Sequence, residues 1–414
     1  MIVGWMFETE DKWNIADPGA IPSGNSTSNF DALHISIIND PGEILAQWQE
    51  FEAFAVDYSS CSAWLNAWYV AHSGNKRLSP FIIVGKSPNG TTQFLLPFMK
   101  RAIGPFNLLI RPGVKHSAYF SGIFTPELAG EISGGNGPDF WRHVLASIPK
   151  IDAIWLEGVP KGRLNLFAGE ESFSSSNACT SMRIDSDWDS QYHEIFNSKA
   201  RNNDKRGYRN LAKLGEVKFS VLTERGAQEQ LLVEMLEQKS ASLRKNGQST
   251  LFEQREILEF YQGLLAQYEI DENASILLSK LCVDDEMLSA NLGIMFNNRF
   301  YGMIISTTNS NARRHSPGRL LLLELNRYLS QNGIVAHDFG TGVAAYKNDW
   351  CDETIERFHV LMSNGAKGKI LARAIRSSAR LKAWAKQSKY KSNVIKTLGW
   401  TTRIRSAIRN GLSL

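Results

Sequence analysis

The order of apolar patterns in the second half of the chain constrains the fold more than any other feature of the sequence. Residues 215–224 alternate between apolar and polar side chains, as a half-buried strand does, and two segments with apolar residues at three-to-four spacing follow. Three apolar runs come next, joined by the turns Asp284-Asp285 and Asn297-Asn298. A helix, a strand, a short helix or turn and a last strand are expected after these, over residues 319–331, 334–340, 342–350 and 356–362. Strands interleaved with helices in this way predict an α/β domain.

The first half shows a similar but less clear mixture of strands and helices. Two apolar runs flank Ser87-Pro88-Asn89-Gly90, and a turn-rich tetrapeptide in such a place predicts a hairpin. A polar Ser/Asn stretch at 172–181 separates this half from the next. Because 414 residues exceed one ordinary core, we expect two domains with appendages. The expected parts are a loose N-terminal segment, an N-terminal domain, a C-terminal domain and a basic tail, over residues 1–29, 30–190, 191–365 and 366–414.

The loop and helix start at 311–318 form the strongest candidate ligand site. A helix N-terminus presents unpaired backbone N–H groups and a partial positive charge, which suit a phosphate. Ser316 fits the N-cap, Pro317 fits the first helical position and Gly318 lets a ligand approach the backbone. An ordinary capped surface helix would show the same residues. Charge-assisted donors are supplied by three arginines, Arg313, Arg314 and Arg319.

Three segments resemble one known family. They read SKARNNDKRGYRNLAKLG at 198–215, SPGRLLLLE at 316–324 and DFGTGVAAYKNDW at 338–350. In this order they resemble the Fem-like GNAT family, in particular its CelD-type branch linked to cellulose and exopolysaccharide biosynthesis. The resemblance implies two fused GNAT-like domains, each with a mixed central sheet flanked by helices. The acyl-CoA loop of that superfamily reads R/Q-x-x-G-x-G/A, and here Ser316 stands in place of its first glycine.

The resemblance further implies an acyl-CoA, such as acetyl-CoA, as the co-substrate of the second domain, and transfer to an amine or hydroxyl. The strand at 299–306 should part from the strand at 334–340 to admit the pantetheine arm. Backbone N–H groups near Met303 and Ile305 would then polarise the thioester carbonyl. No metal is expected.

Side chains for the proton transfers lie after the strand at 334–340 and in the loop. Tyr346 is placed to protonate the leaving thiolate, and Lys347 to hold a CoA phosphate or a sugar carboxylate. A packing tyrosine beside a solvated lysine would look the same. The base for the acceptor has three candidates, Asp338, His337 and His315.

The sequence indicates the residues that would bind the acyl acceptor less clearly. The basic helix at 198–214 either faces an anionic substrate or is a solvated interdomain helix. Glu157 closes a first-half strand and either faces the cleft or lies at an edge. Four aromatic residues either stack on a sugar ring or belong to the core, and they are Trp64, Trp68, Tyr119 and Phe120.

The formal charge of +4 is unevenly distributed, because no Asp or Glu follows Glu356 while Lys and Arg recur from Lys367 to Arg409. Apolar residues at helical spacing make this tail a basic amphipathic segment, which can lie on an anionic membrane surface, contact an acidic partner subunit or pack on the body of the protein. Nucleic acid is not expected as a partner. The apolar positions are Leu371, Ala374, Ile375, Leu381, Ala385, Ile404, Ala407 and Ile408.

The rest of the composition predicts a cytoplasmic protein, peripheral at the inner membrane if the tail binds lipid. We find neither a secretory signal nor an apolar run of the roughly 20 residues that span a bilayer. Four widely separated cysteines predict reduced thiols rather than a metal site or disulfides, and they are Cys61, Cys179, Cys282 and Cys351.

Three functions fit these features. The first is acyl-CoA-dependent N- or O-acyl transfer to a saccharide precursor or a related small molecule. The second is aminoacyl-tRNA-dependent transfer, as in the peptidoglycan branch of the Fem-like group, although the inserted helical hairpin of that branch is not evident here. The third is a catalytically inactive GNAT-shaped subunit of a polysaccharide machine, which the altered loop at Ser316 favours.

Overall fold

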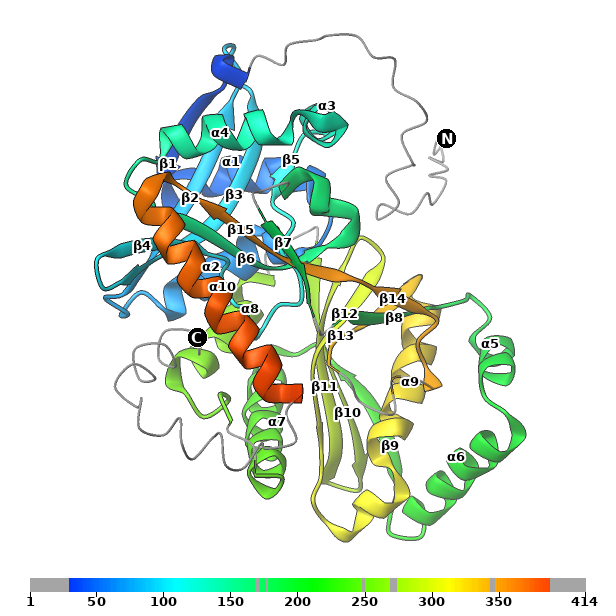
Figure 1. Cartoon of the computed structure of the whole chain (residues 1–414). Helices are drawn as coiled ribbons and strands as arrows, with labels where there is room; N and C mark the ends of the chain where they lie inside the picture. The colour runs from blue at the N-terminus through cyan, green and yellow to red at the C-terminus, as the bar shows by residue number, and fades with distance from the viewer. Residues whose placement is uncertain are drawn as a thin grey trace, which may run out of the picture.

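The strands form two separate sheets, each covered by helices (Figure 1). The computed structural model describes residues 30–167, 171–175, 178–247, 250–268, 274–342, 347 and 349–387. The N-terminal segment expected at 1–29 lies outside the described residues, as does the tail from 388 onward. The ten described helices are α1 Leu45–Phe51, α2 Ser62–Ala71, α3 Pro126–Glu131, α4 Gly137–Ser147, α5 Trp188–Ile195, α6 Ser198–Leu211, α7 Arg225–Lys245, α8 Arg255–Tyr268, α9 Pro317–Gln331 and α10 Gly365–Gln387.

The first sheet, sheet A, has eight strands in the order β1-β2-β3-β4-β6-β15-β7, with β5 paired to β3. Only β4 and β6 pair in parallel among its described strands, so the sheet is mixed. Its strands are β1 His34–Ile38, β2 Leu78–Lys86, β3 Thr92–Ile103, β4 Phe106–Ile110, β5 Ile123–Phe124, β6 Ala153–Pro160, β7 Glu171–Ser174 and β15 Arg357–Ser363.

The second sheet, sheet B, has seven strands in the order β14-β8-β13-β12-β11-β10-β9. It is also mixed, because β12 and β13 are parallel and its other described pairs are antiparallel. The predicted α/β class with two mixed sheets flanked by helices is therefore confirmed. Its strands are β8 Cys179–Arg183, β9 Val217–Leu222, β10 Ala274–Val283, β11 Glu286–Phe296, β12 Arg299–Thr307, β13 Ala336–Thr341 and β14 Glu353–Ile355.

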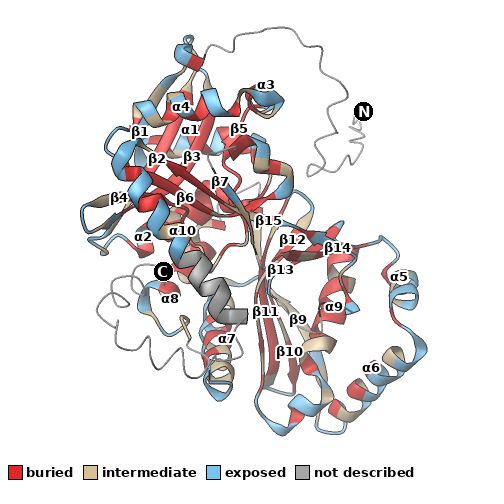
Figure 2. Cartoon of the chain, in the orientation of Figure 1, coloured by how far each residue is buried: buried red, intermediate tan, exposed pale blue. Residues whose placement is uncertain are grey.

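The core forms continuous layers through the molecule (Figure 2). On β2, Ile82 and Val84 face one cluster of buried side chains while Phe81 and Ile83 face another, because successive strand residues point to opposite faces. The cluster around Ile82 also takes in α2, α7, α8 and one face of sheet B, so the two sheets share one hydrophobic core. The far face of sheet B packs on α9.

The sheets are joined by an antiparallel ribbon that the sequence did not predict. β7 pairs with β15 inside sheet A, and β8 pairs with β14 inside sheet B. The chain passes from sheet A to sheet B within residues 175–178 and returns at Glu356. The boundary expected at residue 190 therefore does not separate the strands of the two sheets: β8 precedes it yet lies in sheet B, and β15 follows it yet lies in sheet A.

The basic tail begins as a packed helix. α10 contacts β4, β6 and β15 of sheet A. Leu371 is buried as expected, whereas Ala374 is exposed and Ala372 takes its place in the core. The ammonium of Lys367 lies 3.4 Å from the carboxylate of Asp152. Ile375 is partly buried against the same core, as expected. The remaining predicted apolar positions lie outside the described side chains, and they are Leu381, Ala385, Ile404, Ala407 and Ile408.

Candidate functional site

The candidate site is the gap that opens where β12 and β13 part. Their parallel pairing runs from Arg299 to Tyr301 on β12 and ends at Asp338 on β13, although β12 continues to Thr307. Two glycines face each other just beyond the last pair, since a Cβ on Gly340 would lie 3.5 Å from the carbonyl oxygen of Gly302. The end of the pairing agrees with the parting predicted from the sequence.

The edge of β12 that faces this gap is irregular. Gly302 pairs with Gly293 of β11 and Ile304 pairs with Leu292, so Met303 is an extra residue in a β-bulge. A bulge changes the direction of the strand and re-aims its groups, and bulges are frequent next to active sites. The ammonium of Lys239 on α7 reaches this edge and donates to the carbonyl oxygen of Ile305 at 2.9 Å. Burial and the nearby charges of Arg313 and Lys347 lower the pKa of Lys239.

Lys347 closes the other side of the gap. Its ammonium donates to the carbonyl oxygens at the end of β13, those of Phe339 at 2.8 Å and of Gly340 and Thr341 at 3.0 Å. All three N–H groups are engaged and the residue is 6% exposed. The expected role in holding a phosphate or carboxylate is therefore not supported, because the side chain instead fixes the end of β13. Tyr346 lies outside the described residues.

The loop before α9 has the expected helix start but a different cap. Pro317 is the first residue of α9, as predicted, and Ser316 precedes it. Ser316 makes no side-chain cap and has a left-handed backbone with φ of 57°, the conformation that favours the glycine of the superfamily motif. Gly318 is required for packing, since its Cβ would lie 2.9 Å from the hydroxyl of Thr307.

The charged side chains of this loop are exposed or partly exposed. Arg313 donates to the carbonyl oxygen of Thr308 at 3.2 Å and to the side chain of Asn309 at 3.3 Å. Arg314 donates to the ring of His315 at 3.3 Å. The loop that carries these side chains follows β12 and leads directly into α9.

Arg319 has a structural partner instead of a ligand. Its guanidinium donates two hydrogen bonds to the carboxylate of Asp204 on α6, at 2.6 and 3.1 Å, and lies 4.5 Å from the ring centre of Phe196. The hydroxyl of Tyr192 also donates to Asp204. The expected contact of Arg319 with phosphate is thus replaced by an ion pair that attaches the basic helix α6 to α9.

Asp338 and His337 face opposite sides of sheet B. Asp338 is buried and accepts hydrogen bonds from the hydroxyl of Tyr119 and, at 2.6 Å, from the backbone N–H of Gly340. Burial raises the pKa of this carboxyl, and the two hydrogen bonds oppose the rise. The ring of His337 shares a hydrogen bond with Asn326 at 2.7 Å, and burial lowers its pKa to about 3. His337 is therefore a neutral packing residue. Asp338, the last residue of β13 that pairs with β12, lies at the closed end of the gap.

Sheet A contains a matching pair of parallel strands whose gap is filled. β4 and β6 pair only as far as Ile110 and Trp155. Past that point the backbone N–H of Phe120 donates to the carbonyl oxygen of Gly158 on β6 at 3.1 Å, and a Cβ on Gly158 would lie 2.6 Å from the carbonyl oxygen of Ala118. Residues 118–120 therefore occupy the place beside β6 that β4 leaves.

Arg111 holds this filling segment. Its buried guanidinium donates to the carbonyl oxygens of Val114, Ser117 and Tyr119 at 2.8–3.0 Å. Burial and the charge of Arg357 lower its pKa to about 10, so it stays charged at neutral pH.

The other sequence candidates are accounted for by packing. The rings of Trp64 and Trp68 stack at 5.9 Å between centres inside the shared core, and Tyr119 and Phe120 are buried, so none of the four lines an acceptor groove. Two contacts beside the gap were not predicted, that of Lys239 with Ile305 and that of Tyr119 with Asp338. Lys239 falls three and four residues after the buried Leu236 and Met235, which was a signal that it lies on the packed face of α7, and nothing in the sequence pairs Tyr119 with Asp338.

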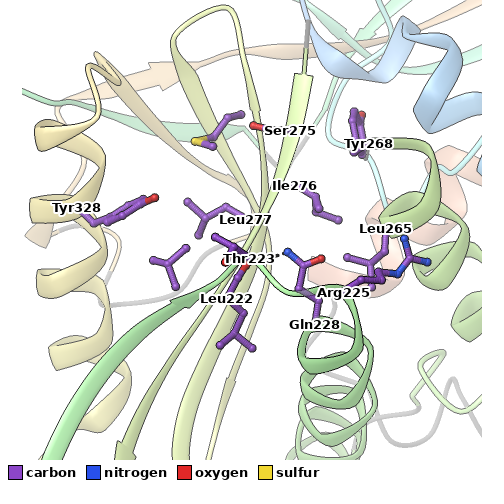
Figure 3. A pocket seen from close by; sticks show the side chains of 12 residues that line it. Leu222, Thr223, Arg225, Gln228, Leu265, Tyr268, Ser275, Ile276, Leu277 and Tyr328 are labelled. Carbon is purple, nitrogen blue, oxygen red and sulfur yellow. Dashed lines mark hydrogen bonds between the residues drawn. The ribbon is translucent and has the colours of Figure 1, made fainter. Parts of the chain in front are cut away.

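A separate pocket lies elsewhere in sheet B (Figure 3). It has a volume of about 280 Å³ and opens at the sheet edge where β9 ends, between α7, α8 and Tyr328 of α9. It contains none of the residues around the gap, and β11 separates its strand β10 from β12. Within the described ranges no group of three or more His, Cys, Asp or Glu residues converges as metal ligands would.

Comparisons with known proteins give one family match and several similar solved structures. Residues 198–348 match the family described as the acetyltransferase (GNAT) domain. The crystal structure of FemX covers 82% of this chain and 99% of its own, with a TM-score of 0.54 at 12% identity. L-PGS from Bacillus licheniformis gives 0.47 at 11% identity, covering 81% and 96%. A tandem GNAT protein from the clavulanic acid biosynthesis pathway gives 0.44 at 13% identity, covering 80% and 99%.

No curated protein sequence matches the chain. The likeness to FemX extends over both sheets, so it shows a shared two-sheet fold. The family match contains the parting strands, the loop and the start of α9. Residues 198–348 are therefore similar to a GNAT acetyltransferase domain, and the two-sheet fold of the chain is similar to that of FemX.

Proposed function

We propose that the chain is an acyl-CoA-dependent acyltransferase whose donor binds in the gap between β12 and β13. The observation that carries this proposal is the end of the parallel pairing at Tyr301 and Asp338, which leaves the backbone of β12 from Gly302 to Thr307 without a strand partner on that side. Backbone groups without a partner are available to a ligand with amides of its own, as the pantetheine arm has.

The mouth of the gap suits the phosphates of the donor. Arg313 and Arg314 are exposed there, and the first turn of α9 directs its backbone N–H groups toward the same end. The arm would then run along β12 toward the bulge at Met303, where backbone N–H groups can stabilise the oxyanion of the tetrahedral intermediate.

Direct transfer is the chemistry that these residues support. An acceptor amine or hydroxyl attacks the thioester carbon, the C–S bond breaks and the CoA thiolate leaves. Asp338 is our candidate base and Tyr346 our candidate proton donor. A thiol nucleophile is disfavoured, because burial raises the pKa of Cys179 to about 11 and raises the pKa values of Cys282 and Cys351.

The acceptor in this proposal is a saccharide precursor or a related small molecule with an amine or hydroxyl. The support is the resemblance of the segments 198–215, 316–324 and 338–350 to CelD-type proteins of cellulose and exopolysaccharide biosynthesis. Acetyl is the simplest acyl group that fits this role.

Calorimetry with acetyl-CoA tests the donor site. We expect one molecule bound per chain, and Arg313→Gln should weaken binding by about tenfold, or about 1.4 kcal/mol. Arg142→Gln is the matched control, because Arg142 is an equally exposed arginine on α4 of sheet A. A folded protein that binds no acetyl-CoA would contradict the proposal and favour an aminoacyl-tRNA donor or an inactive subunit.

We also propose that the tail from Lys367 onward attaches the enzyme to an anionic membrane surface, with an acidic partner subunit as the other possibility. On the outer side of α10, Lys369 and Arg373 are exposed and Ile370 is 60% exposed. No helix of the described part is long and apolar enough to cross a membrane. Full-length protein should co-sediment with anionic vesicles, less so at high salt, and Lys369→Glu/Arg373→Glu should reduce the bound fraction. Equal sedimentation of the two proteins would contradict membrane attachment.

A further inference from the structure

The side-chain amine of Lys239 reaches the edge of β12 that no longer pairs with β13. It lies on α7, on the helix face that packs on sheet B, and its Nζ atom donates to the carbonyl oxygen of Ile305 at 2.9 Å. Ile305 is four residues beyond Tyr301, the last residue of β12 that pairs with β13. The amine therefore stands beside the stretch of β12 along which the donor would lie.

The two charged groups that act on Lys239 are both cations. Arg313 and Lys347 are its charged neighbours, and none of these three cations makes an ion pair within the described ranges. Each donates instead to backbone carbonyls at the ends of the two parting strands. Like charges and burial both disfavour the ammonium form, so the neutral amine of Lys239 is more accessible than that of an exposed lysine.

Burial also lowers the pKa of Lys347, but the hydrogen bonding of this side chain differs. Its nitrogen donates to three carbonyl oxygens and the side chain is buried, so no side of the nitrogen is open to an acyl group. Lys239, by contrast, donates to the carbonyl oxygen of Ile305 and is partly exposed. This hydrogen bond holds the nitrogen near the gap while leaving the lone pair of the neutral amine available.

We propose that Lys239 is a self-acylation site, modified by the acyl-CoA bound in the gap; this inference rests on the proposed function. The Nζ atom attacks the thioester carbon, a C–N bond forms, the C–S bond breaks, and the proton lost by the amine leaves with the CoA thiol. The product is an amide, too stable to pass the acyl group on, so acceptors still receive it directly from the thioester. Acylation removes the charge of Lys239 and adds bulk at the gap, which should weaken the binding of a second donor molecule.

The test uses full-length protein incubated with acetyl-CoA and no acceptor, followed by peptide mass spectrometry after digestion with a protease that does not cut at lysine. Lys199 and Lys205, exposed on α6, serve as internal references for uncatalysed acetylation. We expect Lys239 to be acetylated at least about tenfold faster than either, a difference of about 1.4 kcal/mol in activation free energy. Added CoA should slow the reaction at Lys239 and leave Lys199 and Lys205 unchanged.

Two variants distinguish a failure of this inference from a failure of the proposed function on which it rests. Lys239→Arg keeps the charge and should lose the modification while still binding acetyl-CoA in calorimetry, and Lys218→Arg, at an exposed position on β9, should behave as the wild type. If the wild type binds acetyl-CoA but acetylates Lys239 no faster than the α6 lysines, the self-acylation site is wrong and the proposed function stands. If it binds no acetyl-CoA, both are wrong.

Discussion

Sheets A and B each contain one pair of parallel strands that part, and they differ in the groups that lie beyond the point of parting. In sheet B, the backbone of β12 beyond Tyr301 is reached by the side chain of Lys239. In sheet A, the chain itself enters beside β6 and bonds to Gly158. The same local topology thus leaves a backbone edge without a strand partner in sheet B and a filled one in sheet A.

The two arginines that follow the parting strands illustrate this difference between the sheets. Arg111 comes directly after β4 and is buried against three carbonyl oxygens of the filling segment. Arg313 comes six residues after the end of β12, and is exposed. One arginine is buried inside the fold, and the other lies on the surface with hydrogen bonds only to its own loop.

The largest effect should come from exchanging these arginines for methionine. Arg111→Met removes the donor for three buried carbonyl oxygens and should lower the free energy of unfolding by about 3 kcal/mol or more. Arg313→Met should change it by less than about 0.5 kcal/mol, as surface substitutions do. Urea unfolding of both variants measures the contrast. Equal losses would show that the filling segment is not what closes sheet A.

A smaller effect is expected at the contact between the filling segment and the open gap. The hydroxyl of Tyr119 donates to Asp338, and Tyr119→Phe should lower the free energy of unfolding by about 1–3 kcal/mol, because a buried carboxylate loses a donor. Tyr208→Phe is the matched control: its hydroxyl also donates to a carboxylate, that of Glu324, which keeps Arg327 as a partner. A larger loss for Tyr208→Phe would contradict this ranking.

The loss in Tyr119→Phe should also depend on pH. The folded protein raises the pKa of Asp338, so this group stabilises the fold below its unfolded pKa and loses that contribution as pH rises through the folded pKa. The hydrogen bond from Tyr119 lowers the pKa and limits the loss. The stability difference between wild type and Tyr119→Phe should therefore grow with pH, and unfolding curves over an acid-to-neutral series check it. A constant difference would mean that Asp338 keeps its proton throughout.

The smallest effect is expected at Ser316. Its left-handed backbone costs a residue with a side chain about 1–2 kcal/mol, and Ser316→Gly removes this strain but adds freedom to the unfolded chain. We expect a net gain of at most about 1 kcal/mol, with acetyl-CoA affinity equal or higher. Thermal unfolding and calorimetry measure the two quantities. A weaker affinity for the glycine variant would show that the Ser316 hydroxyl binds the ligand.

Local patterns in the sequence predicted three neighbouring strands of sheet B well, but not β8 and β14. The apolar runs at 275–283, 287–296 and 299–306 became β10, β11 and β12, with left-handed residues at the predicted turn Asn297-Asn298. Each of these signals lies within a few neighbouring residues. The same is true of Pro317, whose missing N–H and fixed φ suit the first position of a helix.

Partners from distant parts of the chain were not predictable in the same way. The pattern at 356–362 indicates a strand but does not say that β15 joins sheet A, because pairing depends on the competing edges of the folded sheets. Arg319 and Lys347 were read as ligand-binding cations, since nothing near them in sequence shows that Asp204 and the carbonyls of β13 would satisfy them. Residue type gives the charge, and only the fold gives its partner.

The ribbon of β7 and β8 with β15 and β14 connects the two sheets so that neither is complete without the other. β15 lies inside sheet A, between β6 and β7, and β8 lies inside sheet B, between β13 and β14. A fragment cut at residue 190 would lack an interior strand of its own sheet and carry a strand that belongs to the other. Two such fragments could form both complete sheets only by associating and exchanging these strands. We therefore expect the chain to unfold as one cooperative unit, because each sheet is incomplete without a strand from the other side of residue 190.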